Sequence, residues 1–188
     1  MKRQLWVFAV PVLLAACGPA PSSPPVSPPP PPPSQPAPPP SSQTPVEPIP
    51  PGQPGGLPDD RTPLPEGPID PKSAQGAAQV VQTYYALIGE KKYADAWALW
   101  QGDSGMSADQ FAASFGAFSQ YDAQIGAPGE MEGAAGSSYV DVPVQVYGRT
   151  TAGAPFHRLG TVTLRRVNDV PGSTQAQRQW HIYRINLP

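Results

Sequence analysis

Few side chains in this chain have the type and spacing that catalysis or metal binding requires. Cys17 is the only cysteine among 188 residues, so it has no disulfide partner within the chain and a separate role is expected for its thiol. His157 and His181 are the only histidines, and neither has a nearby His, Cys or Asp at the spacing of a metal site. The sequence contains no Gly-x-Ser-x-Gly elbow and no glycine-rich phosphate loop. It therefore predicts no catalytic residue, no metal and no cofactor.

Cys17 ends an N-terminal segment that is typical of exported proteins. Lys2 and Arg3 precede an apolar run of 12 residues, Leu5 to Ala16, whereas a membrane-spanning helix needs about 20. The run ends in Leu14-Ala15-Ala16-Cys17, which resembles the lipobox of bacterial lipoprotein signal peptides. The resemblance implies that residues 1–16 are a signal peptide and that Cys17 carries the lipid, including palmitate-type chains. The alternative is an ordinary cleaved signal peptide with an incidental Cys17.

The expected anchor defines a location. Two or more acyl chains hold a protein on a bilayer stably, whereas one chain does so only marginally. Gly18 follows Cys17, where the resemblance would associate an Asp with retention at the inner membrane. We therefore expect an exported protein that is lipid-anchored at the outer membrane and faces the periplasm.

Residues 17–72 comprise the lipidated Cys17 and a proline-rich linker. Residues 18–72 contain 24 of the 30 prolines and no aromatic residue, so they cannot bury enough apolar surface to offset the entropy of ordering. Proline density favours extended polyproline II, with a reach on the order of 170 Å, and Pro51 to Gly56 are expected to add a flexible joint. We predict a disordered tether; alternatively, its proline-rich motifs are ligands for a groove-type domain.

Residues 73–188 have the composition of a folded domain. They contain all seven tyrosines, three of the four tryptophans and four of the five phenylalanines. Ser73 is a plausible N-cap for a helix that ends at Gly89, and a second helix is expected from Lys91 to Trp100. Ser107 and Gln110 form a capping-box pattern before a third helix whose aromatic face runs from Phe111 to Phe118.

The remainder predicts strands. Residues 139–147 alternate between valines and other residues, which places four valines on one face. Pro143 within them indicates a sheet edge or a bulge. Further strands are expected at 121–126, 156–167 and 180–187. The fold class is therefore α+β, with N-terminal helices packed on one face of a curved antiparallel sheet.

The order of these elements resembles that of NTF2-like domains. Residues 80–88 and 92–97 look like the opening helices of that superfamily, and Trp180 to Ile185 looks like its last strand. The resemblance covers roughly residues 76–187. It implies a cone-shaped cavity, which the lack of a strand pair between the second and third helices would make shallow or remove. Enzymes of the superfamily use a carboxylate and polar partners in the cone, for which the best matches are Tyr84, Tyr85 and Asp141. Asp141 alternates with the valines, however, and is expected to face away from the helices.

Charge is distributed unevenly along the domain. Residues 142–188 contain six arginines and one acid, Asp169, although the whole chain has a net charge of −2. Four of these arginines are candidates for binding an anionic partner: Arg158, Arg165, Arg166 and Arg184. Arg165 and Arg166 are neighbours on one strand and should face opposite sides of the sheet. Alternatively, the arginines only solubilise the sheet surface.

The sequence thus predicts a non-catalytic envelope lipoprotein that displays a small ligand- or partner-binding domain on a long tether. Its expected partners are the membrane, through Cys17, and an envelope protein, the cell wall or another anionic partner, but not nucleic acid. The alternative is a small isomerase or hydrolase of the NTF2-like type with a polar pocket. A purely structural spacer-and-cap protein is a third reading.

Overall fold

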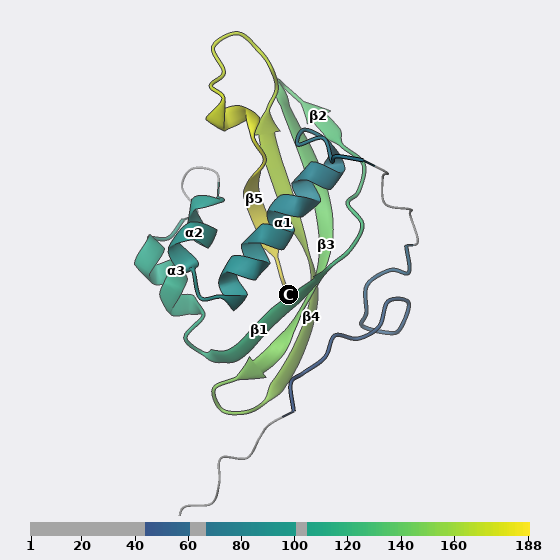
Figure 1. Ribbon diagram of the computed structural model, residues 1–188, viewed down its shortest axis with the longest axis vertical. Helices are drawn as coiled ribbons and strands as arrows, with labels where there is room; N and C mark the ends of the chain where they lie inside the picture. Colours follow the sequence, from purple (N-terminus) through teal and green to yellow (C-terminus); the bar gives the residue numbers. More distant parts are fainter. Residues whose placement is uncertain (1–43, 61–66, 101–104) are drawn as a thin grey trace, which may run out of the picture. The chain divides into compact units, whose positions relative to one another are not determined.

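The computed structural model describes residues 44–60, 67–100 and 105–188 (Figure 1). The predicted signal peptide, Cys17 and the first part of the linker lie outside the described residues. Among the described residues, no helix is long and apolar enough to cross a membrane.

Three helices precede the sheet, as expected. They are α1 (Ala74–Gly89), α2 (Tyr93–Ala98) and α3 (Ala108–Ser114). Ser73 caps α1 by accepting a hydrogen bond from the Gly76 N–H, and Ser107 with Gln110 forms the predicted capping box of α3. The helical aromatic face predicted as far as Phe118 is too long, because α3 ends at Ser114 and Phe118 begins the first strand.

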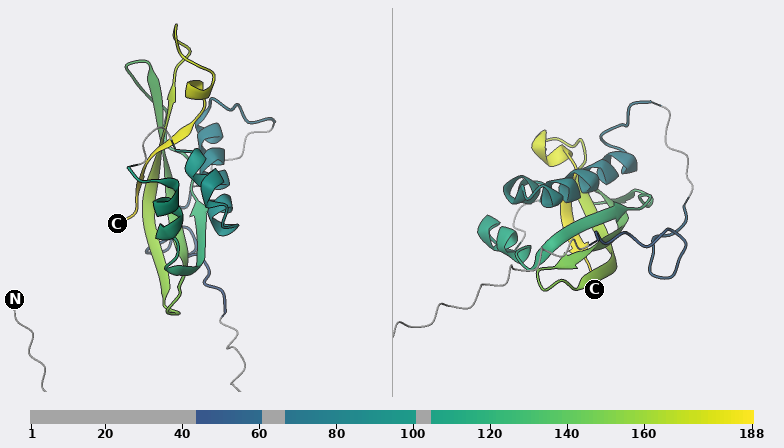
Figure 2. Two further views of the ribbon diagram at one scale, coloured as in Figure 1. Left: turned by 90° about the vertical axis from the view of Figure 1, so that its left-hand side faces the viewer. Right: turned by 60° about the horizontal axis from the view of Figure 1, so that its bottom comes forward.

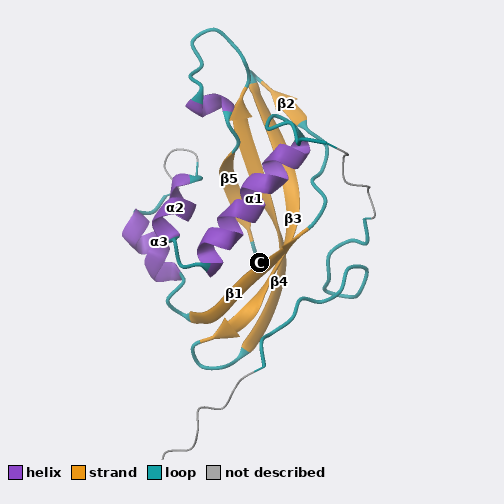
Figure 3. Cartoon of the chain, in the orientation of Figure 1, coloured by secondary structure: helices purple, strands orange, loops and turns teal. Residues whose placement is uncertain are grey.

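Five strands form one antiparallel sheet, which is curved and carries the helices on one face (Figures 2 and 3). The strand order is β1-β3-β4-β5, and β2 pairs with β3 beyond the end of β1. A short 3-10 helix, η1 (Ala176–Arg178), precedes the last strand. The bounds are β1 (Phe118–Ile125), β2 (Glu132–Ala134), β3 (Ser137–Thr150), β4 (Pro155–Val167) and β5 (His181–Asn186).

The core lies between α1 and the valine face of β3. Val140, Val142, Val144 and Val146 are at most 1% exposed, which confirms the face predicted from the alternation. They pack with Val81 and the rest of the buried apolar cluster. Complete burial of a valine side chain contributes about 1.5 kcal/mol or more, so this face fixes the sheet beneath the helices.

Pro143 lies on β3, which is a central strand and not the predicted edge. Its carbonyl accepts a hydrogen bond from the Gly126 N–H, one residue after β1 ends at Ile125. In an antiparallel strand the N and the C=O of one residue point to the same side. An N–H at Pro143 would therefore point between the end of β1 and the start of β2. No strand pairs with this side of β3 at this position, so the lack of this donor breaks no strand pairing.

Part of the predicted linker contacts the domain. Residues 44–57, hereafter the strap, lie beside the sheet on the side away from α2 and α3 (Figure 1). They contact the face of the sheet opposite the helices, hereafter the outer face, and Leu57 is 3% exposed. The predicted flexible joint is a hydrogen-bonded turn, in which the Gly52 N–H donates to the Leu57 carbonyl at 2.8 Å. The described residues, including those of the predicted linker, all belong to one compact unit.

Candidate ligand cavity

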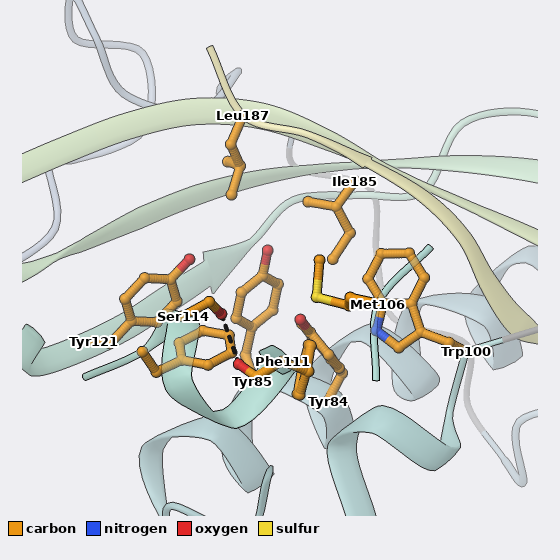
Figure 4. Close-up of a pocket in the computed structure, with 10 residues that line it drawn as sticks. Tyr84, Tyr85, Trp100, Met106, Phe111, Ser114, Tyr121, Ile185 and Leu187 are labelled. Atoms are coloured by element: carbon orange, nitrogen blue, oxygen red, sulfur yellow. Dashed lines mark hydrogen bonds between the residues drawn. The ribbon is translucent and has the colours of Figure 1, made fainter. Parts of the chain in front are cut away.

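A cavity of about 170 Å³ lies where the helices meet the last strand (Figure 4). Tyr84 and Tyr85 reach it from α1, and Tyr121 reaches it from β1. Ile185 and Leu187, at the end of β5, cover its opposite side. Its remaining lining residues come from α3 and the segments around it: Trp100, Met106, Phe111, Ser114 and Phe115.

Tyr84 and Tyr85 are both buried although they are neighbours on one helix. Their exposed fractions are 3% and 6%, and their ring centroids are 4.9 Å apart in an edge-to-face arrangement. Consecutive residues on a helix point about 100° apart, so α1 must be covered on two sides. The sheet and the pair α2 and α3 supply that cover, and the Tyr84 ring contacts Phe111 at a centroid distance of 6.3 Å.

The hydroxyl groups of Tyr84, Tyr85 and Tyr121 point into the space below Ile185 and Leu187 (Figure 4). The Tyr85 hydroxyl is inaccessible to solvent and has no hydrogen-bond partner among the described residues. Burial raises the pKa of both Tyr84 and Tyr85, and the neighbouring Tyr121 raises each pKa further. These hydroxyls therefore stay protonated at neutral pH and can donate a hydrogen bond to a ligand.

The lining of the cavity contains no carboxylate and no imidazole among the described residues. Asp141 lies exposed on the outer face, where its carboxylate accepts a hydrogen bond from the Thr163 hydroxyl at 2.6 Å. This confirms that Asp141 faces away from the helices and separates it from the two tyrosines. The cavity can therefore hold an apolar group and a hydrogen-bond acceptor, and its described lining residues supply no general base.

The two histidines contact backbone carbonyls. His157 Nε2 lies 2.8 Å from the Glu47 carbonyl oxygen of the strap, and His181 Nε2 lies 3.0 Å from that of Ala176. Within residues 44–60, 67–100 and 105–188, no group of three His, Cys, Asp or Glu side chains could hold a metal ion.

The four candidate arginines do not form one patch. Arg165 lies over the Tyr139 ring on the outer face, and Arg184 is paired with Thr163 on the same face. Arg166 faces the helix side, where its guanidinium lies 5.3 Å from the Trp180 ring centroid. Arg158 also faces the helix side, but it is eight residues away along β4, or about 27 Å. The structure thus confirms the opposite orientation of Arg165 and Arg166, and only Arg165 and Arg184 remain together.

Sequence reasoning found two of the cavity residues, Tyr84 and Tyr85, and missed the others. Trp100, Met106 and Leu187 lie in or next to loops, and no spacing rule connects them with α1. It also missed Gln120 and Gln145, which hold the strap. The position of Gln145 between valines that face the helices could have indicated a polar side chain on the other face.

Two solved structures are similar to this chain in backbone arrangement. One is a nuclear transport factor 2 (NTF2-like) superfamily protein from Salmonella enterica serovar Typhimurium, with 12% identity and a TM-score of 0.45 over 61% of this chain and 89% of that one. The other is the Kfla4162 protein from Kribbella flavida, with 16% identity and a TM-score of 0.43 over 63% and 91%. No protein-family model matches the chain. No curated protein matches it either. The described helices and antiparallel sheet confirm the α+β fold class expected from the sequence.

Proposed function

We propose that this protein is an envelope lipoprotein whose NTF2-like domain binds a small, largely apolar ligand in the cavity beneath β5 without transforming it. The observation that carries the proposal is the buried Tyr85 hydroxyl, which points into an aromatic-lined cavity without a partner. A buried donor that lacks an acceptor costs about 1–3 kcal/mol, and a ligand with an acceptor would recover that cost.

The size and lining of the cavity define the class of ligand. An apolar protein cavity of about 150 Å³ can accommodate benzene. The cavity here has about 170 Å³ and is lined by rings and aliphatic side chains, with hydroxyls on one side. The ligand is therefore a single ring or a short branched chain that carries a carbonyl, ether or other acceptor oxygen.

The positions of the titratable groups support binding without reaction. Isomerisation or hydrolysis requires a group that takes up a proton at neutral pH. The raised pKa values of Tyr84 and Tyr85 keep these hydroxyls protonated, and Asp141 lies on the other face of the sheet. The enzymatic alternative thus lacks a base among the described lining residues.

Anchoring through Cys17 is part of the proposal and is supported by the sequence alone. Leu14-Ala15-Ala16-Cys17 follows a short apolar run, and the proline-rich stretch separates it from the domain. Such a protein would present its cavity to the periplasm while attached to the outer membrane.

Two probes that differ in a single acceptor test the cavity. Acetophenone and ethylbenzene have nearly the same shape, but only acetophenone has a carbonyl oxygen. In NMR titrations of the chain from Gly18 to Pro188, both should shift signals of the lining residues. Tyr85→Phe should weaken the binding of acetophenone about twofold to tenfold, because one hydrogen bond contributes about 0.5–1.5 kcal/mol, and should leave that of ethylbenzene unchanged.

The control variant is Tyr183→Phe, which removes a hydroxyl from the outer face, where Tyr183 is 52% exposed. It should bind both probes as the unaltered chain does. The proposal fails if neither probe shifts the lining residues, or if Tyr85→Phe affects both probes equally.

A further inference from the structure

The strap is held by side chains of the outer face that bind its backbone. The Val46 N–H donates to Gln120 Oε1 at 3.0 Å, and Gln120 Nε2 donates back to the Val46 carbonyl at 3.0 Å. The Ile49 N–H donates to Gln145 Oε1 at 2.8 Å. The two glutamines come from the neighbouring strands β1 and β3. They therefore bind the strap at two positions, Val46 and Ile49.

Gln145 binds the strap with its whole amide group. Its side chain is fully buried, and its Nε2 donates to the Gly55 carbonyl at 2.8 Å while its Oε1 accepts from Ile49. A buried amide without partners costs free energy, so a side chain of this kind in a sheet indicates a specific polar contact. At Gln145, the strap supplies the hydrogen bonds to both amide atoms.

Arg149 and His157 donate two further hydrogen bonds to the strap. A terminal guanidinium nitrogen of Arg149 donates to the Thr44 carbonyl at 3.0 Å. His157 Nε2 lies 2.8 Å from the Glu47 carbonyl, and since a carbonyl only accepts, this nitrogen carries the hydrogen. Together with the glutamines, these side chains come from β1, β3 and β4.

The contacts match the spacing of an extended proline-rich peptide. Val46 and Ile49 are three residues apart, which is one turn of polyproline II and places their N–H groups on the same side. The residues that precede them, Pro45 and Pro48, have no N–H that would require a partner. The outer face therefore binds two backbone N–H groups of the strap, Val46 and Ile49, that lie three residues apart.

We propose that the outer face of the sheet is a recognition surface for an extended proline-rich peptide, and that the strap of the same chain is its resident occupant. Gln120 and Gln145 are the central recognition residues, and Arg149 and His157 bind the N-terminal half of the strap. The linker thus already contacts the domain at Thr44, and not only from Ser73 onward.

The first test measures hydrogen exchange by NMR on the chain from Gly18 to Pro188. The Val46 and Ile49 amides should be protected, although a proline-rich linker would leave them open to solvent. Gln145→Met keeps the volume of the side chain but removes both hydrogen bonds, so exchange at Ile49 should accelerate about tenfold or more. Gln120→Met should have the same effect at Val46.

Gln82→Met is the matched control, because Gln82 is exposed on α1, far from the strap in the sequence. It should leave both amides protected. Protection of the Val140 and Val162 amides shows in each variant that the sheet remains folded. If Val46 and Ile49 exchange at the rate of a free peptide in the unaltered chain, or if Gln145→Met does not accelerate Ile49, the proposal is overturned.

The second test asks whether the surface recognises the peptide in trans. Residues 44–56 are replaced by a glycine-serine stretch of equal length, Leu57 is kept, and a synthetic peptide of residues 44–57 is added up to about 1 mM, the range of the effective concentration that a short linker supplies. Saturable shifts are expected at Gln120, Gln145 and Arg149, and they should disappear when both glutamines are changed to Met. No saturable shift in a folded sheet, or equal shifts with a peptide of scrambled order, would refute recognition.

Discussion

At the scale of single residues, two buried tyrosines and the partly buried Tyr121 determine what the cavity can do. Tyr84, Tyr85 and Tyr121 carry hydroxyls into an otherwise apolar space, and burial is the largest cause of the raised pKa of each. The nearby Arg158 acts in the opposite direction on the pKa of Tyr121, but burial dominates. The cavity is therefore a hydrogen-bond donor site at neutral pH.

The raised pKa values predict that the protein loses stability in alkali. The unfolded chain releases the tyrosine protons at pH about 10, whereas the folded chain retains them to higher pH. The stability that these residues contribute is therefore complete below pH 10 and falls as the pH rises above it. Between pH 8 and pH 11, Tyr85→Phe should reduce the fall in the free energy of unfolding by about 1.4 kcal/mol, as measured by urea denaturation.

Tyr183→Phe serves as the control, because Tyr183 is 52% exposed. Its free energy of unfolding should fall between pH 8 and pH 11 as far as that of the unaltered chain. Identical behaviour of Tyr85→Phe and Tyr183→Phe would show that Tyr85 ionises as readily in the folded chain as in the unfolded one.

At the scale of elements, the end of β5 closes the cavity over a glycine of β4. A Cβ atom at Gly160 would lie 2.2 Å from the Asn186 carbonyl oxygen and 2.7 Å from Leu187 Cδ2. The absence of a side chain at Gly160 thus allows the last residues of the chain to lie close to β4, and Leu187 to cover the tyrosines.

Gly160→Ala should displace the end of β5 and open the cavity. We expect a loss of about 1–3 kcal/mol in the free energy of unfolding, which is typical of overpacking, and weaker binding of ethylbenzene and acetophenone alike. Thermal denaturation and the NMR titration measure the two effects. Gly133→Ala is the control, since its Cβ would meet no atom within 4 Å. Unchanged probe binding in Gly160→Ala would show that the end of β5 does not close the cavity.

The turn of the strap should depend on glycine in a similar way. A Cβ at Gly56 would lie 2.3 Å from the Pro50 carbonyl oxygen, so Gly56→Ala should break the turn and accelerate hydrogen exchange at Gly52. Gly133→Ala should leave that exchange unchanged. Preserved protection of the Gly52 amide in Gly56→Ala would show that the turn adapts to a side chain.

The elements that repeat a pattern could be predicted from the sequence, and those that depend on distant partners could not. The valines of β3 and the capping box at Ser107 are local signals, and both were confirmed. The third helix was predicted too long because Phe118 continues its spacing, yet Phe118 pairs with Thr150 in the sheet. Pro143 was assigned to a sheet edge or a bulge, because the sequence does not show that β1 ends opposite this proline.

The strap shows the same limit of local reasoning more strongly. Its proline content argues against a hydrophobic core of its own, but its partners Gln120 and Gln145 lie 74 and 96 residues away from the amides that they bind. At the cavity, Tyr84 and Tyr85 stood out as adjacent tyrosines on one helix. Leu187 did not, because only the register of β5 brings it there.

At the scale of the whole molecule, the strap shortens the reach of the proposed tether. If the tether ends at Thr44, residues 18–43 connect the anchor to the domain, which is 26 residues in place of 55. The proposed lipoprotein would thus connect its anchor to its domain through about half as many residues as the linker composition alone implies.

The proposed anchor predicts a specific effect of changing Cys17. Cys17→Ala should leave an unlipidated precursor that no longer incorporates labelled palmitate, because the only thiol of the chain would be lost. Cys17→Ser is a second variant of closer size and should behave in the same way. Undiminished acylation of either variant would contradict anchoring at this residue.

The most direct test of the central claim is to locate a bound probe by intermolecular nuclear Overhauser effects. With acetophenone added to the chain from Gly18 to Pro188, the account predicts contacts from the probe to the methyl groups of Ile185 and Leu187, which cover the cavity. Contacts should also reach the Tyr85 ring. Contacts only to outer-face residues such as Tyr139 and Tyr183 would contradict the account, because the probe would then bind on the opposite side of the sheet.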